Sequence, residues 1–212
     1  MKNILISLFA ITALLVNGSA LAAKCKYEEE TADLFSGVKT VRTKWNKLTP
    51  WGEKGVHFWS AKGETSIFVS VISEGGDKRL GIRIKFKRKS QFKPTREELE
   101  NAILVPAGTN LLIKLADDTV VALPALELAQ GVSGFTRPYA NGTDDYILVT
   151  QAVIEYGLDA SAAEALTAQR AVALGIVTST GRFDIPVTKK NRDDIKQAIE
   201  CALWKKREGD KK

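Results

Sequence analysis

The chain has 212 residues, of which 44% are apolar and 26% charged, with 16 glycines and only 6 prolines. This composition excludes low-complexity and collagen-like chains, and the length suits one globular domain with a sizeable core. Lysine and arginine outnumber the acidic residues by 31 to 25, which gives a formal net charge of +6.

Residues 1–22 match a cleaved secretory signal. Lys2 supplies a positive start, residues 4–16 form an apolar run, and small residues precede the expected cleavage point after Ala22. The run is shorter than the roughly 20 residues that cross a bilayer, so an uncleaved anchor is disfavoured. No later stretch is long and apolar enough to span a membrane. We expect the mature chain to be periplasmic or secreted.

Most of the chain after the signal predicts β-strands. The clearest pattern is at residues 79–87, where apolar and basic side chains alternate with the period of two that marks a half-buried strand. The β-branched residues 66–73 precede it, and the Glu-Gly-Gly-Asp loop at 74–77 predicts a hairpin between the two. Further strands are predicted at residues 38–47, 111–115, 119–123, 146–154, 171–178 and 182–188, with hairpin turns at 116–118 and 179–181.

Three helices are predicted. The segments 95–98 and 161–164 both match the Ser/Thr-x-x-Glu capping box. A C-terminal helix follows from the apolar residues of 195–203, which recur at helical spacing, with Asn191 as its N-cap. Residues 205–212 lack apolar side chains and predict a frayed, charged tail.

Short turns rather than crossover helices join the successive strands, which favours antiparallel pairing. We therefore predict an α+β fold, mainly antiparallel β-sheet with short helices and a C-terminal amphipathic helix. No repeat and no Ser-, Gly- or Pro-rich linker divides the chain, so a single domain is predicted at residues 23–204.

The chain has two cysteines, Cys25 and Cys201, one near each end of the predicted domain. An oxidising compartment favours their pairing, so we predict one disulfide that ties the two ends together. Two buried free thiols are the alternative. A redox centre is disfavoured because there is no Cys-x-x-Cys motif. Cys201 falls on the flank of the apolar stripe of its helix, which suits a tether to a terminal segment alongside.

Both ends of the predicted domain resemble a known group of proteins. The opening, with Cys25-x-Tyr27, then Asp-Leu-Phe-Ser-Gly at 33–37 and a strand through Thr43 and Trp45, resembles uncharacterised bacterial periplasmic and envelope proteins. The end is similar too, with a hairpin that leads into an amphipathic helix bearing a cysteine. The resemblance implies a periplasmic protein with an N-to-C-terminal disulfide, and it implies no catalytic residue and no ligand.

Few residues suggest catalysis, and no cofactor or metal site is predicted. His57 is the only histidine, which excludes sites that need several imidazoles, and no Gly-x-Ser-x-Gly elbow or phosphate-binding glycine loop is present. The paired carboxylates at 117–118, 144–145 and 193–194 are interpreted as turn residues and helix N-terminal charges. Weak calcium binding at the loop 141–145 is the alternative for the second pair.

The first candidate binding region is basic. Arg83, Lys85, Lys87 and Lys89 share one face of their predicted strand, opposite its apolar side chains, and concentrate positive charge on a flat surface. An anionic envelope polymer, an anionic lipid or an acidic protein would fit this surface, whereas the expected location disfavours nucleic acid. The alternative is a solvated face on an edge strand, where lysines discourage pairing between sheet edges.

The second candidate binding region is aromatic. Trp45, Trp51 and Trp59 lie close together in sequence, and Trp51 falls in a predicted exposed Thr-Pro-Trp-Gly turn near His57. Exposed tryptophans stack on sugar rings or bind a protein partner. The alternative is that Trp45 and Trp59 are core residues and that His57 is a packed neighbour.

The leading hypothesis is a non-enzymatic periplasmic protein that binds an anionic envelope ligand or a protein partner through the basic sheet face. One alternative is a hydrolase of envelope material with its site near His57. Another is a structural subunit of an envelope assembly.

Overall fold

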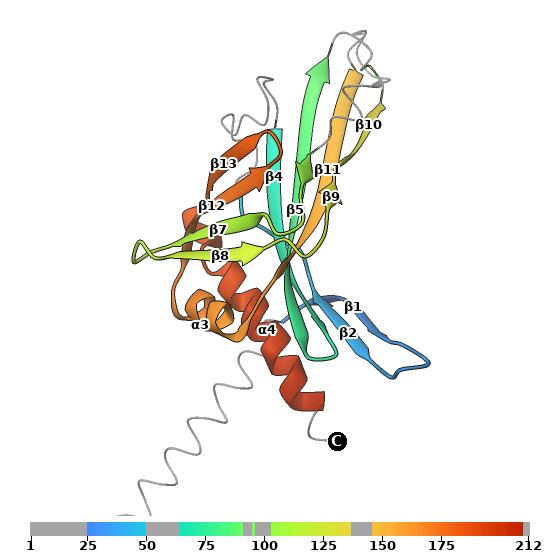
Figure 1. Cartoon of the computed structure of the whole chain (residues 1–212), viewed down its shortest axis with the longest axis vertical. Coiled ribbons are helices and arrows are strands. Elements are labelled where there is room, and N and C mark those ends of the chain that lie inside the picture. Colours follow the sequence, from blue (N-terminus) through green and yellow to red (C-terminus); the bar gives the residue numbers. More distant parts are fainter. Residues whose placement is uncertain (1–24, 50–63, 91–94, 96–102, 137–145, 210–212) are drawn as a thin grey trace, which may run out of the picture.

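The computed structural model describes residues 25–49, 64–90, 95, 103–136 and 146–209 (Figure 1). The strands are β1 (Tyr27–Ala32), β2 (Lys39–Thr43), β3 (Asn46–Lys47), β4 (Glu64–Glu74), β5 (Asp77–Ser90), β6 (Leu104–Val105), β7 (Asn110–Leu115), β8 (Val120–Pro124), β9 (Ala129–Gln130), β10 (Val132–Thr136), β11 (Tyr146–Gly157), β12 (Ala171–Thr178) and β13 (Gly181–Pro186). The helices are α3 (Ala160–Ala168), the 3-10 helix η1 (Lys189–Asn191) and α4 (Asp194–Gly209).

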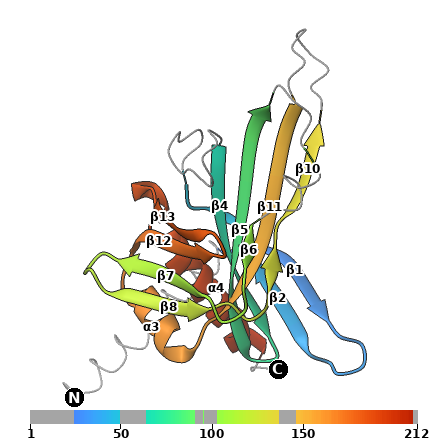
Figure 2. The same cartoon turned by 45° about the horizontal axis from the view of Figure 1, so that its top comes forward.

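The strands form two main antiparallel sheets. The larger has seven strands in the order β1-β2-β4-β5-β11-β10, with β3 also paired to β4, and the smaller has the order β13-β12-β7-β8. The pair β6-β9 stands apart from both. The smaller sheet and α3 lie on one side of the long strands β4, β5 and β11, and the β1–β2 hairpin projects from the other side (Figures 1 and 2). The predicted α+β fold, mainly antiparallel sheet with a C-terminal helix, is confirmed.

The β4–β5 hairpin forms the middle of the larger sheet. Its two strands alternate apolar and polar residues, and pairs such as Val69 opposite Ile82 are fully buried on the same face. Gly75 and Gly76 make the turn with φ angles of +58° and +110°, which glycine adopts without steric cost. The predicted hairpin is thus confirmed.

One cluster of buried side chains is shared by both main sheets and both α-helices. We call the face of the larger sheet that contributes to this core the inner face, and the opposite one the outer face. The cluster includes Ile82 of β5, Tyr156 of β11, Ile113 of β7, Leu166 of α3 and Ile199 of α4. Each of these residues is at most 1% exposed.

The hairpins of the smaller sheet confirm two predicted turns, at 116–118 and 179–181. Asp118 has a φ of +69°, and the carboxylate of Asp117 accepts a hydrogen bond of 3.1 Å from the backbone N–H of Thr119. The interpretation of this acidic pair as turn residues is therefore confirmed. The pair at 144–145 and the loop 141–145 lie outside the described residues.

The predicted strand at 38–47 is interrupted. β2 ends at Thr43, whose hydroxyl accepts a hydrogen bond of 2.9 Å from the N–H of Val71, while the N–H of Lys44 turns toward the carbonyl of Lys26. The ladder to β4 resumes only at Asn46. The prediction of one continuous strand was wrong. The hydroxyl of Thr43 accepts a hydrogen bond from β4, and the backbone N–H of Lys44 bonds to Lys26, so neither group continues the ladder between β2 and β4.

The helix starts also differ from prediction. The predicted helix near 161–164 is present as α3. Its N-cap is Asp159, whose carboxylate accepts a hydrogen bond of 2.7 Å from the N–H of Ala162, so the predicted capping box at 161–164 is wrong. Asn191 lies in η1, and its side-chain amide donates to the carbonyl of Lys47 instead of capping α4. α4 continues to Gly209, into the segment predicted to be a frayed tail. The predicted helix at 95–98 lies outside the described residues, apart from Thr95.

The predicted disulfide between Cys25 and Cys201 is confirmed. The two Cα atoms are 5.4 Å apart across a sequence separation of 176 residues. Next to the bond, the phenol of Tyr27 donates a hydrogen bond of 3.1 Å to the carbonyl of Cys201. The start of β1 is thereby fixed to the middle of α4.

Asp194, in the first turn of α4, should make stability depend on pH. Burial, and then the charge of Asp193, raise its pKa to about 6 from an ordinary value of 3.8. The folded chain therefore binds a proton more tightly than the unfolded chain does, and stability from this group falls as pH rises from about 4 to about 6. At pH 7 the Asp194→Asn variant should melt at a higher temperature than the parent, whereas at pH 4 the two should melt at the same temperature. An equal difference at both pH values would contradict this expectation.

Candidate binding surface

The outer face of the larger sheet carries a row of cationic side chains on β5. Arg83, Lys85 and Lys87, which we call the basic row, alternate with three buried residues of the inner face, Ile82, Ile84 and Phe86. Lys85 and Lys87 are exposed, whereas Arg83 is half-buried. The backbone of Lys89 continues the strand, and its side chain lies outside the described set.

The basic row lies in the middle of the sheet and not at an edge. β5 is paired with β4 over residues 77–87 and with β11 over residues 79–90. The alternative interpretation, that these lysines discourage pairing at an exposed edge, is therefore wrong for the basic row, because the strand has a partner on both sides at these positions. Within the described residues, the edges of this sheet are β1 and β10.

Trp45 connects the two regions that the sequence predicted separately. It lies between β2 and β3 and reaches across β4 to Gly81 of β5, where an added Cβ would lie only 3.1 Å from Cη2 of the indole. The guanidinium of Arg83 lies 4.1 Å from the centre of the indole ring, and that of Arg42 lies 5.8 Å away. Both distances are within the range of cation–π attraction. Trp45 is half-buried on the outer face, so its interpretation as a core residue is wrong.

Buried polar atoms without hydrogen-bond partners gather around this indole. Within the described residues six such side-chain atoms occur, and four of them are Arg42 Nε, Trp45 Nε1, Ser70 Oγ and Arg83 Nε. Three of the four are obligatory N–H donors, and one of these, Arg42 Nε, lies 3.4 Å from the carboxylate of Glu29 as an ion pair. A buried donor without an acceptor costs free energy, and the indole N–H of Trp45 and Nε of Arg83 are the two donors of this set without such an ion pair.

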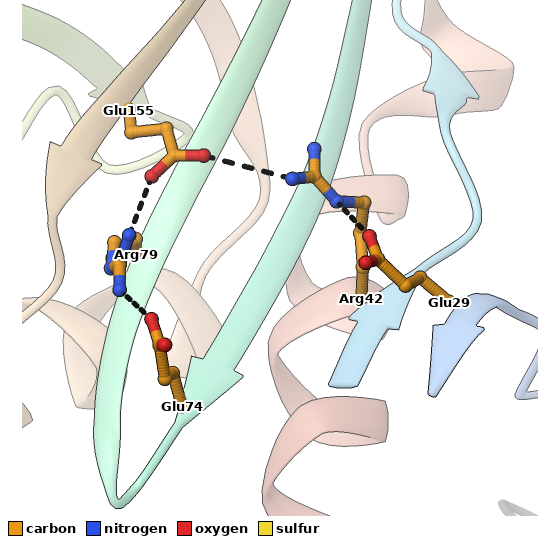
Figure 3. A network of polar contacts seen from close by, with 5 residues as sticks. All are labelled: Glu29, Arg42, Glu74, Arg79 and Glu155. Carbon is orange, nitrogen blue, oxygen red and sulfur yellow. Dashed lines mark hydrogen bonds and ion pairs between the residues drawn. The ribbon is translucent and has the colours of Figure 1, made fainter. Parts of the chain in front are cut away.

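Next to the indole, five charged side chains from five strands form a continuous chain of ion pairs (Figure 3). Glu155 of β11 is central: its carboxylate lies 2.9 Å from Arg79 and 3.7 Å from Arg42. Arg79 also contacts Glu74, and Arg42 contacts Glu29 of β1 at 3.4 Å. The hydrogen bond that Arg79 donates to Glu155 is the main reason why the pKa of Arg79 is raised. These arginines are neutralised, so the net positive charge lies in the basic row.

An apolar strip runs beside the basic row. Across β5 and β11, Arg83 lies opposite Val153 and Lys87 opposite Val149, and β10 adds Val132 to the same face. Val153 is 38% exposed and Val132 77% exposed. We define Val132, Val149 and Val153 as the apolar strip. A partner on the outer face would meet cations and apolar side chains side by side.

The other predicted site residues fall elsewhere. Trp51, His57 and Trp59 lie outside the described residues, so the predicted aromatic region is represented only by Trp45. Sequence reasoning missed the contact between Trp45 and Arg83. The available signal was Gly81, because a glycine inside a strand pattern indicates a close approach of another group.

Within the described residues, no three His, Cys, Asp or Glu side chains gather as a metal site would require. A shallow hollow beside the disulfide is lined by Lys26, Thr43, Lys44, Asn46, Gln197, Ala198 and Cys201, a set without a carboxylate or an imidazole. No helix in the described part of the chain is both long and apolar enough to cross a bilayer.

Comparison with protein-family models, with curated proteins and with solved structures found no match to this chain.

Proposed function

We propose that this chain is a non-enzymatic periplasmic protein that binds an anionic envelope ligand or an acidic protein partner through the outer face of its larger sheet. The observation that supports this most is the position of the basic row. Its cations stand on a central strand, where they have no part in protecting a sheet edge; Lys85 and Lys87 are exposed, and the half-buried Arg83 lies beside an indole.

The chemistry of the surface favours an anion with an apolar or ring-shaped portion. Among the described residues, Arg83 and Lys85 have no ion pair, and Lys87 stands opposite Glu64. Arg83, stacked on Trp45, holds a planar guanidinium beside the ring, a group that pairs with carboxylates and phosphates. The predicted signal and the disulfide between Cys25 and Cys201 support an oxidising compartment outside the cytoplasm.

Charge reversal in the basic row tests the proposal. Lys85→Glu combined with Lys87→Glu should weaken binding to dextran sulfate at low salt by about tenfold or more, because four units of charge change where the polymer lies. Binding of the parent should also weaken as salt is raised. Affinity can be measured by biolayer interferometry, with neutral dextran as the blank.

The matched control is Lys114→Glu combined with Arg182→Glu, two exposed cations on β7 and β13 that change the net charge equally. It should bind within about twofold of the parent, since these residues belong to the smaller sheet, which shares the core with the inner face. Equal losses in both variants would show that net charge, and not this face, attracts the polymer, and the proposal would then fail.

A further inference from the structure

The tip of the β1–β2 hairpin holds two large apolar side chains in solvent. Leu34 is 95% exposed and Phe35 is 99% exposed. The turn that carries them is well ordered: the carboxylate of Asp33 accepts hydrogen bonds from the N–H of Phe35 at 3.0 Å, the N–H of Ser36 at 2.6 Å and the hydroxyl of Ser36 at 2.8 Å. The N–H of Gly37 closes the turn on the carbonyl of Asp33. The tip therefore displays the Leu-Phe pair at a fixed place.

The hairpin that carries the tip is acidic, although the chain as a whole is basic. Residues 26–39 contain two lysines and four carboxylates, all exposed, which leaves a net charge of −2, whereas the whole chain has +6. Anionic lipid surfaces repel such a segment. An apolar pair with acidic neighbours instead fits a protein surface on which apolar and cationic side chains lie together.

The outer face of the same protein is such a surface. The apolar strip borders the basic row, with Val153 opposite Arg83 and Val132 one strand further out. A chain cannot bind its own tip there, because β1 and β10 are at opposite edges of the larger sheet. The β1–β2 hairpin projects away from the body in both views (Figures 1 and 2), so its tip is open to another molecule.

We propose that the occupant of the outer face is a second copy of this chain, whose Leu34–Phe35 tip docks on the apolar strip beside the basic row. In a two-fold pair each copy gives one tip and receives one, which closes the assembly as a dimer. This inference goes beyond the proposed function, since the contact is mainly apolar and needs no anionic ligand. In such a dimer, the docked tip would lie next to the basic row, where the anionic ligand is proposed to bind.

Sedimentation velocity of the purified chain over a wide concentration range tests the proposal. The parent should convert from monomer to dimer as concentration rises. Leu34→Ser combined with Phe35→Ser should weaken dimerisation by about tenfold or more, since two apolar side chains lose their buried site. Val120→Ser is the control, because Val120 is also exposed, at 54%, but lies on β8 of the smaller sheet. A parent that remains monomeric throughout, or a control that is affected equally, would overturn the inference.

Cross-linking then locates the contact. Both native cysteines are in the disulfide, so an introduced cysteine is a selective probe. A mixture of Phe35→Cys protein and Val132→Cys protein should form mixed disulfides faster than either variant does alone. If Phe35→Cys protein instead links mainly to a second Phe35→Cys molecule, the two tips contact each other, and the proposal that the tip docks on the apolar strip is overturned. Dextran sulfate binding by the Leu34→Ser, Phe35→Ser variant should persist, so failure of dimerisation and failure of the proposed function give different results.

Discussion

Removal of the disulfide should lower the melting temperature of this protein more than any other change considered. A cross-link between Cys25 and Cys201 encloses nearly the whole folded chain, since the two cysteines are 176 positions apart. The loss of unfolded-chain entropy from such a loop corresponds to about 5 kcal/mol as an upper figure, and measured disulfides more often give about 2–4 kcal/mol. For a domain of this size, the lower range corresponds to a fall of about 5–15 °C.

Two experiments separate the cross-link from the packing of the cysteine side chains. Reduction of the parent breaks the bond but keeps both sulfur atoms, whereas Cys25→Ala with Cys201→Ala also removes the sulfur of Cys201, which is only 3% exposed. Both should melt well below the oxidised parent, and the double variant somewhat lower because a buried atom is lost. The reductant should not change the melting of the double variant. A parent whose melting is the same with and without reductant would contradict the argument.

The reduced protein should nevertheless remain folded at room temperature. α4 buries Ile195, Ile199 and Ala202 in the shared core, and these contacts do not depend on the bond. The start of β1 would keep its hydrogen bond from Tyr27 to α4 and its pairing to β2. Hydrogen exchange should therefore show lost protection in β1 first, with little change in β5 and β11.

The strands that sequence predicted well are those with one buried and one exposed face. Alternation identified β5, because burial on one face imposes a period of two, and the β-branched apolar run at 66–73 identified β4. β1 was missed because its sequence, Tyr-Glu-Glu-Glu-Thr-Ala, has one half-buried residue and no alternation. Its pairing with β2 and the neighbouring disulfide hold it in the sheet, and neither is a local signal.

The candidate surface was predictable only in part, for the same reason. The shared face of Arg83, Lys85 and Lys87 follows from strand periodicity alone. The central position of β5 depends on its pairing with β11, more than fifty residues later, and the contact between Trp45 and Arg83 depends on where the interrupted β2–β3 segment crosses the sheet. Long-range pairing of this kind cannot be read from local pattern, so sequence alone left the edge strand open as an alternative.

Gly81→Val should remove the indole from the outer face and, with it, the support of Arg83. A Cβ at this position would lie 3.0 Å from Ser70 Oγ and 3.1 Å from Cη2 of Trp45, and valine adds two methyl groups beyond it. Ser70 is fully buried in the sheet, so the indole is the group that must move. Overpacking of this kind costs about 1–3 kcal/mol, and the cation–π contact with Arg83 is lost as well.

Gly134→Val is the matched control, because this glycine is also in a strand of the larger sheet, yet an added Cβ would meet nothing within 4 Å. In urea unfolding, Gly81→Val should lose stability, while Gly134→Val should match the parent or gain slightly from the higher strand propensity of valine. Binding to dextran sulfate should weaken only in Gly81→Val, since Arg83 loses the ring that holds it beside Lys85. If Gly81→Val binds the polymer as the parent does, the indole is a structural support alone, and the binding surface reduces to the exposed lysines of β5.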